Sequence, residues 1–132
     1  MEIVRQAYDA WNRGDFDQML EFADPEIEFR PASVSGVARI PGVDPVYHRP
    51  EGVRRFWETF IDPWEQITVE VEELRDGGDC VVAIARFRAV ARDGLKVDLP
   101  SMHVLTFRGS RVIRFEVFAD RVEALEAAGL SE

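Results

Sequence analysis

The sequence predicts a single α+β domain in which helices come first and an antiparallel sheet follows. Apolar residues repeat at helical spacing in the first part of the chain, whereas from residue 66 onward long alternating runs are separated by glycine-containing turns. A chain of 132 residues suits one domain, and residues 1–132 contain neither an internal repeat nor a linker. Helices of this kind must cover one face of the sheet, because its apolar side chains need burial.

Two helices are expected at the start. Gly14 ends the first, and Asp15, with Gln18 three residues later, is typical of a capping box for a short second helix that continues to Phe22. The apolar residues of the first helix are spaced for one buried side; they are Ile3, Val4, Ala7, Tyr8 and Trp11.

A short strand, an irregular segment and a third helix come next. Ile27 and Phe29 alternate with charged residues and predict the strand. Residues 31–49 contain several prolines and glycines, so we expect a long loop, which in a compact domain is often functional, for instance as a pocket rim. Pro50 suits the first turn of the third helix. The buried side of that helix is expected to carry Val53, Phe56, Trp57 and Phe60.

Four long strands are expected at residues 66–75, 80–91, 95–107 and 111–118. The turns between them are predicted at Gly77-Gly78, at Asp93-Gly94 and at Gly109-Ser110, each as a two-residue loop. Asp120, with Glu123 after it, predicts the cap of a last short helix.

Two-residue loops would set the register of the whole sheet. Side chains alternate across a strand, so Arg86, Ser101, His103 and Glu116 are expected to share one face with apolar neighbours. Charged groups embedded in such a face are costly unless they pair or function. The expected pairs are Ile84 with His103, Arg86 with Ser101, Arg88 with Leu99, and His103 with Glu116.

The other face of the predicted sheet is apolar, and no segment remains to cover it. An exposed apolar patch of this size usually marks an interface, so we expect a homodimer packed sheet to sheet. The expected contact residues are Ala85, Phe87, Val104, Phe115 and Val117.

Composition excludes several other classes. A net charge of −9 argues against binding to nucleic acid and to anionic membranes. The single Cys80 excludes a disulfide framework and a cysteine metal cluster. No apolar run is long enough for a spanning helix and no secretory leader is evident, so we expect a cytoplasmic protein. His48 and His103 have no ligand spacing, and no glycine-rich nucleotide motif is present, so neither metal nor cofactor is expected.

At this point the chain resembles the nuclear-transport-factor-2-like superfamily, within it the SnoaL-like and ketosteroid-isomerase-like group. The segments that carry the resemblance are "YDAWNRGDFDQMLEFADPEIEFRP", "YHRPEGVRRFWETF" and "MHVLTFRGSRVIRFEVFADRVEALEAAGL". The resemblance implies a cone-shaped curved antiparallel sheet, made of four long strands and a short first strand and covered by three N-terminal helices. It also implies one pocket and, commonly, a dimer. The group contains isomerases, cyclases, dehydratases, hydrolases and non-catalytic proteins, so its fold does not specify a reaction.

The resemblance also assigns positions. The catalytic base of the ketosteroid isomerases falls on Arg30, and arginine cannot act as a base at physiological pH. The aspartate that stabilises the oxyanion falls on His103, and its assisting tyrosine falls near Ala7 or Tyr8. An aromatic pocket position matches Trp57. Carboxylates near Asp120 act as acid/base groups in the polyketide cyclases.

From the residues themselves, His103 is the leading candidate for a general acid/base, held by Glu116, with Arg86 to stabilise negative charge. The alternatives are a buried histidine with satisfied hydrogen bonds and a structural Arg86–Glu116 ion pair. Asp120 is either a pocket acid or only a helix cap. The residues expected to contact a ligand are Tyr8, Trp11, Tyr47, His48, Trp57, Arg88, Ser101 and Phe118, although the aromatic ones also suit a core and Tyr47 and His48 also suit an exposed loop.

Three functions therefore remain open. The first is a cofactor-free isomerase, cyclase or dehydratase that acts on a small apolar carbonyl or hydroxyl compound through acid/base chemistry of His103 and Glu116. The second is a non-catalytic ligand-binding protein. The third is a structural dimer whose polar interior only fills the fold.

Overall fold

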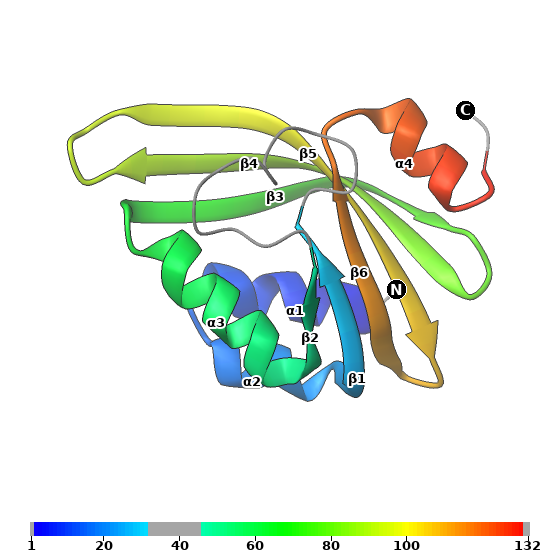
Figure 1. Cartoon of the computed structure of the whole chain (residues 1–132). Helices are drawn as coiled ribbons and strands as arrows, with labels where there is room; N and C mark the ends of the chain where they lie inside the picture. Colours follow the sequence, from blue (N-terminus) through cyan, green and yellow to red (C-terminus); the bar gives the residue numbers. More distant parts are fainter. Residues whose placement is uncertain (1, 32–45, 131–132) are drawn as a thin grey trace.

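A computed structural model describes residues 2–31 and 46–130. It shows an α+β fold in which a strongly curved sheet wraps over three helices (Figure 1). The expected loop at residues 31–49 falls mostly outside the described residues. The helices are α1 (Glu2–Asn12), α2 (Phe16–Glu21), α3 (Arg49–Ile61) and α4 (Arg121–Ala127). The strands are β1 (Ala23–Arg30), β2 (Tyr47–His48), β3 (Trp64–Asp76), β4 (Cys80–Ala91), β5 (Lys96–Arg108) and β6 (Arg111–Phe118).

The sheet is mixed rather than purely antiparallel, which corrects the sequence-based expectation. In the described part of the chain its order is β2-β1-β6-β5-β4-β3, and β1 runs parallel to β6. Strands β3 to β6 form the antiparallel meander that the sequence predicts. A parallel neighbour for β1 was not foreseeable from local patterns, because β1 and β6 lie far apart in the sequence.

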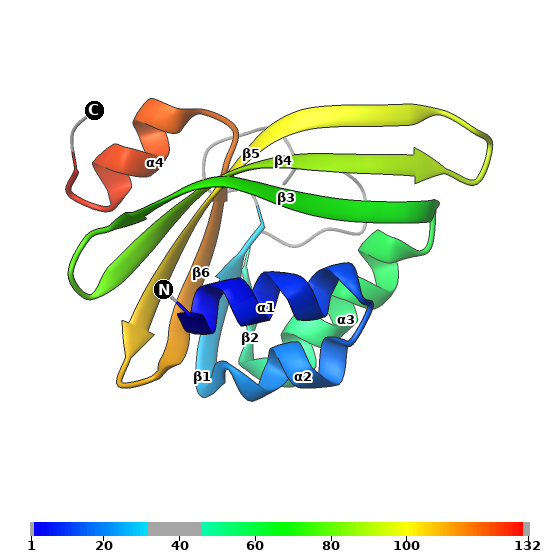
Figure 2. The same ribbon diagram turned by 180° about the vertical axis from the view of Figure 1, so that it is seen from behind.

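The helices lie on both faces of the sheet. Figure 2 shows α1, α2 and α3 together on the inner side of the curve, whereas α4 lies on the outer side. The caps predicted at Asp15 and Asp120 are present, since the side chains accept hydrogen bonds from the backbone N–H groups of Gln18 and Val122. The sequence suggested that nothing covers the outer face. In the structure, α4 packs on part of it.

The β4–β5 turn is one residue longer than predicted. Val90 pairs with Lys96, and the N–H of Ala91 donates to the carbonyl oxygen of Leu95 at 2.8 Å, so residues 92–94 form a three-residue loop. Gly94 takes the left-handed conformation with φ 93°, as the last position of such a loop requires. The Asp-Gly signal is compatible with both loops, and the longer one shifts the register by one residue.

The other two strand pairs shift as well. The Gly109-Ser110 turn forms as predicted, but an irregularity after Thr106 places His103 opposite Val117 instead of Glu116. Between β3 and β4, the turn and a bulge near Val71 together shift the pairing by one residue, so that Val71 lies opposite Ala85. The observed pairs are Ala83 with His103, Ala85 with Ser101, Phe87 with Leu99, and Val104 with Glu116.

A shift of one residue moves a set of side chains to the opposite face, because the side-chain period of a strand is two. The inner face carries the main core, which joins Ala83, Ala85, Val81, Val69 and Leu105 to apolar side chains of α1 and α3. The outer face carries a second cluster beneath α4. Its buried members are Cys80, Val82, Ile84, Met102, Val104, Phe118, Ala124 and Leu125.

The interface residues expected from the sequence do not share the outer face. Ala85, Phe87, Phe115 and Val117 belong to the inner core or pack against it, and only Val104 lies on the outer side, beneath α4. The apolar patch that motivated a sheet-to-sheet dimer is therefore a consequence of the wrong register.

An ion pair between Asp24 and Arg108 connects the start of β1 to β5, the strand beyond β6 in the sheet. The buried Asp24 carboxylate accepts from the N–H of Glu26 at 2.8 Å and from the Arg108 guanidinium at 2.8 Å. The backbone hydrogen bond from Glu26, together with Arg108, lowers the pKa of Asp24. The carboxylate therefore stays charged, and it helps to hold the edge of the inner core in place.

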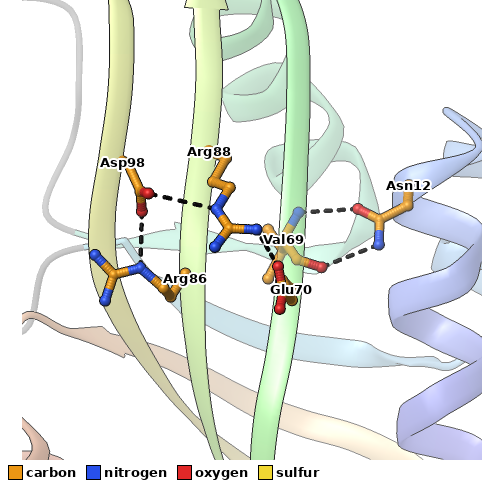
Figure 3. A network of polar contacts seen from close by, with 6 residues as sticks. All are labelled: Asn12, Val69, Glu70, Arg86, Arg88 and Asp98. Carbon is orange, nitrogen blue, oxygen red and sulfur yellow. Dashed lines mark hydrogen bonds and ion pairs between the residues drawn. The ribbon is translucent and has the colours of Figure 1, made fainter.

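Asn12 connects the end of α1 to the edge of the sheet. Its side-chain Nδ2 donates to the carbonyl oxygen of Val69 at 3.0 Å, and its Oδ1 accepts from the N–H of Val69 at 2.9 Å (Figure 3). β3 is an edge strand in the described sheet, so these backbone groups would otherwise lack a strand partner. The amide takes the place of a neighbouring strand and fixes α1, which carries Tyr8, against the sheet.

We expect Asn12→Ala to lower the free energy of unfolding by about 1–3 kcal/mol, because two partly buried backbone groups lose their partner. The measurement is urea unfolding followed by circular dichroism. Gln6→Ala is the matched control, since Gln6 lies on the same helix, is exposed and donates an exposed hydrogen bond to Glu2. Equal stability of the two variants would show that the Asn12 contact does not hold the helix.

Candidate functional site

Three polar side chains form a hydrogen-bonded chain inside the fold. The hydroxyl of Tyr8 lies 2.6 Å from Nδ1 of His103, and Oγ of Ser101 lies 2.9 Å from Nε2 of the same ring. Tyr8 and His103 are 8% and 6% exposed, and Ser101 is half-buried. Both ring nitrogens of His103 therefore have a protein partner.

Local structure explains how these residues meet. Tyr8 lies on the buried side of α1, one helical turn after the buried Val4. Ser101 and His103 are two residues apart on β5, so they point to the same, inner face. The sequence predicted that His103 and Ser101 share a face, and this is confirmed. It did not predict the partner of His103, because Tyr8 is 95 residues away in the chain.

Burial determines the charge state of His103 and Tyr8 in this hydrogen-bonded chain. Because the imidazole is removed from water without a charged partner, burial lowers the pKa of His103 to about 4. Burial also raises the pKa of Tyr8, so that its hydroxyl keeps its proton. His103 is consequently neutral at physiological pH, with one ring nitrogen as donor and the other as acceptor. A neutral ring of low pKa is a weaker base than an ordinary histidine.

Aromatic rings lie next to His103. The Tyr8 and His103 rings are nearly parallel, at an interplanar angle of 11° with centroids 5.7 Å apart. The Phe115 ring follows at 5.1 Å from His103. Trp57 and Trp11 belong to the same interior, and their ring centroids are 5.9 Å apart. Such surroundings suit an apolar ligand that carries one or two polar groups.

The expected His103–Glu116 pair does not form. Glu116 lies beside Val104 in the register, on the outer face, whereas His103 faces inward. Arg86 is also on the outer face, where its Nε donates to the carboxylate of Asp98 at 2.7 Å. Arg88 bonds to Asp98 and to Glu70 on the same surface (Figure 3). The physical reason is again the one-residue shift in strand register, which places Arg86 and Glu116 on the face opposite to His103.

The remaining candidates are dispersed. Phe118 is buried beneath α4 in the outer cluster, away from His103. Asp120 is exposed and caps α4. Tyr47 is not in an exposed loop but in the inner core, in ring contact with Phe29 and Phe56. His48 is exposed and stands immediately before α3.

Two of the surface grooves in the described part of the chain lie away from the site. One, of about 540 Å³, lies between the end of α2, the start of β1 and the start of α3, and it is lined in part by Leu20, Glu51 and Arg111. The second continues along α2 and α3. Tyr8, Ser101 and His103 line neither groove. Within the described residues, no cluster of His, Cys, Asp and Glu suits a metal ion, and no helix is long and apolar enough to cross a membrane.

Comparison with known proteins identifies the family. The model of the SnoaL-like domain matches residues 4–115, which include Tyr8, Ser101 and His103. The chain belongs to the SnoaL-like domain family. No match was found among curated proteins.

Solved structures agree with this SnoaL-like fold. A protein of the NTF2-like fold and of unknown function from Burkholderia pseudomallei is 22% identical, with a TM-score of 0.81 over 96% of this chain and 94% of that one. TerC, co-crystallised with polyporic acid, is 19% identical, with a TM-score of 0.80 over 97% and 96% of the two chains. A ketosteroid-isomerase-like protein from Catenulispora acidiphila, in complex with trimethylamine, is 17% identical, with a TM-score of 0.72 over 98% and 94%. At these identities the likeness shows the fold alone.

The buried neutral His103 of this SnoaL-like protein makes its stability depend on pH. The unfolded histidine has a pKa near 6.5 and the folded one a pKa of about 4, so between these values the unfolded chain binds the extra proton. We expect the free energy of unfolding to fall as pH decreases from about 6.5 to 4, by at most about 3 kcal/mol from this group. Urea unfolding across this range measures the slope.

His103→Asn should flatten this dependence, because asparagine does not titrate. His48→Asn is the control, since His48 is exposed and its replacement should leave the slope unchanged. An identical slope in wild type and His103→Asn would show that the folded imidazole is not held neutral.

Proposed function

We propose that this SnoaL-like protein binds a small, uncharged, apolar carbonyl or hydroxyl compound beside Tyr8, His103 and Ser101, and that it catalyses a cofactor-free proton transfer on it. The observation that carries the proposal is the hydrogen-bonded chain of these three side chains inside an aromatic interior. Such polar groups are costly to bury, and a purely apolar filling would serve stability as well or better. Their presence is therefore better explained by a ligand.

The chemistry follows from the charge state. The two hydrogen bonds within the chain leave one hydroxyl proton free to donate to a carbonyl oxygen. That oxygen takes up negative charge as a neighbouring C–H bond gives its proton to the imidazole of His103. In the described residues, the hydrogen bonds of the three side chains join them to one another and to no carboxylate. We assign His103 to proton transfer and hydrogen bonding, and Glu116 no longer has a geometric basis for orienting it.

The relatives support the ligand class in general terms. TerC was co-crystallised with polyporic acid and the Catenulispora protein is in complex with trimethylamine, so two proteins of this fold have been crystallised with small organic molecules. The resemblance to ketosteroid isomerases favours a carbonyl substrate. Arg30 at the position of their base, bonded here to Glu28 at 3.0 Å, indicates that the proton is moved by other groups.

The test uses 2-tetralone, an uncharged apolar ketone with exchangeable protons next to its carbonyl group. We expect the wild type to accelerate exchange of these protons with D₂O by about 10²-fold or more over buffer, as positioned acid/base groups usually do. His103→Asn should keep binding, measured by titration, and lose the exchange. Proton NMR follows the reaction.

Glu116→Gln is the matched control, because Glu116 lies on the outer face and its variant should exchange at the wild-type rate. Binding of 2-tetralone without exchange would favour the non-catalytic ligand-binding protein. If the ketone neither binds nor raises the thermal stability of the protein, only a structural role is left for the hydrogen-bonded chain.

We infer further that the protein forms a homodimer through the charged part of its outer sheet face, here called the outer network and defined as Glu70, Arg86, Arg88 and Asp98. Two acidic and two basic side chains lie together there on neighbouring strands (Figure 3). Under a two-fold rotation such a surface is complementary to its own copy. The resemblance to the superfamily, whose members commonly pair through their sheets, supports the same face.

We expect the wild type to sediment as a dimer and Arg88→Glu to shift the equilibrium toward monomer by about tenfold or more, since like charges then face each other. Analytical ultracentrifugation at several concentrations makes the measurement. Arg5→Glu on the exposed side of α1 is the control for the change of net charge. A monomeric wild type at high concentration would contradict the proposal.

A further inference from the structure

From Leu99 to His103, exposure decreases along the inner side of β5. Leu99 is 54% exposed, Ser101 is half-buried, and His103 is 6% exposed. The β5–β6 register begins at the Met102–Phe118 pair, so Ser101 lies one residue beyond the last residue that β6 covers. Ser101 therefore stands between the open end of the sheet and the buried imidazole, whereas Tyr8 lies at the inner end of the hydrogen-bonded chain.

A neutral imidazole gives this chain a direction, because one ring nitrogen carries a proton and the other accepts one. When Nε2 of His103 carries the proton, it donates to Oγ of Ser101, and Tyr8 donates to Nδ1. The Ser101 hydroxyl is then free to donate to a ligand. When Nδ1 carries the proton, it donates to Tyr8, and the Ser101 hydroxyl must donate to Nε2. The serine oxygen can then only accept from a ligand.

We propose that Ser101 is the ligand-facing end of this chain, and that the tautomer of His103 decides whether its hydroxyl donates to, or accepts from, an uncharged oxygen group of the ligand. The inference rests on the proposed function and adds a specificity-determining residue to it. The site would recognise a ketone through one tautomer and the corresponding alcohol or enol through the other. No change in the charge of the protein is needed to alternate between them.

The surroundings support an uncharged ligand. Arg86 and Arg88 bond to carboxylates on the outer face, so neither contributes a positive charge to the inner one. Burial holds the pKa of His103 at about 4, and burial likewise raises the pKa of Tyr8. The three side chains thus remain uncharged near pH 7, which is the condition under which two tautomers exist.

The first test needs no ligand. Long-range ¹H–¹⁵N correlation spectra of protein with ¹⁵N-labelled histidine report the tautomer of His103, with the exposed His48 as an internal reference. A buried N–H without a partner is less tolerated than an unpaired acceptor. We therefore expect Ser101→Ala to favour the proton on Nδ1, directed at Tyr8, and Tyr8→Phe to favour the proton on Nε2, directed at Ser101.

Ser101→Thr keeps the hydroxyl and should retain the wild-type tautomer distribution, so Ser101→Ala and Ser101→Thr decide the question even if Tyr8→Phe does not fold. The same tautomer distribution in Ser101→Ala as in wild type would overturn the proposal, as would a charged imidazole at pH 7.

The second test adds acetophenone, whose only polar group is a hydrogen-bond acceptor. Its binding to the wild type should increase the fraction of His103 with the proton on Nε2, and Ser101→Ala should bind it about tenfold more weakly. Binding with no change of tautomer would overturn the inference but leave the proposed function intact. Failure to bind any apolar ketone, with the tautomers responding to the variants as expected, would instead contradict the proposed function.

Discussion

The three-residue loop at residues 92–94 sets the register between β4 and β5, and the arrangement of the interior depends on it. With this loop, Ala83 and Ala85 lie opposite His103 and Ser101, so small side chains flank the polar chain on one side. A loop one residue shorter would place Ile84 and Arg86 there and bring a guanidinium against the imidazole. The bulge between β5 and β6 acts in the same direction by placing Val117, rather than Glu116, beside His103.

This register divides the charges of the protein between two environments. The outer network keeps its arginines paired with carboxylates at the surface, where ion pairs contribute modestly to stability. At the inner face, Tyr8, His103 and Ser101 are neutral at physiological pH, and they satisfy one another through two hydrogen bonds. A buried imidazole in these surroundings is suited to hydrogen bonding and relayed proton movement more than to the ionised chemistry that a carboxylate partner would support.

The position of α1 is the second condition for the site. Two hydrogen bonds from Asn12 to the edge strand β3 and the packing of Val4 in the core hold this helix, and Tyr8 lies between these two residues. The Tyr8 hydroxyl can then meet Nδ1 of His103 at 2.6 Å, across a sequence separation of 95 residues. The site therefore depends on one contact at a sheet edge and on one register, both outside the three side chains themselves.

Local sequence patterns by themselves determined the α+β class, three of the four helices as inner cover, the caps at Asp15 and Asp120, and the four-strand meander. They also placed Ser101 and His103 on one face, because two residues of the same strand keep their relation whatever the register.

Only the tertiary structure decided which residues meet across strands, since a single inserted residue in a turn or bulge exchanges the faces without changing the local pattern. For the same reason Glu116 and Arg86 could not be placed from the sequence, and the parallel β1–β6 pair and the contact of Tyr8 with His103 required the packing of distant segments.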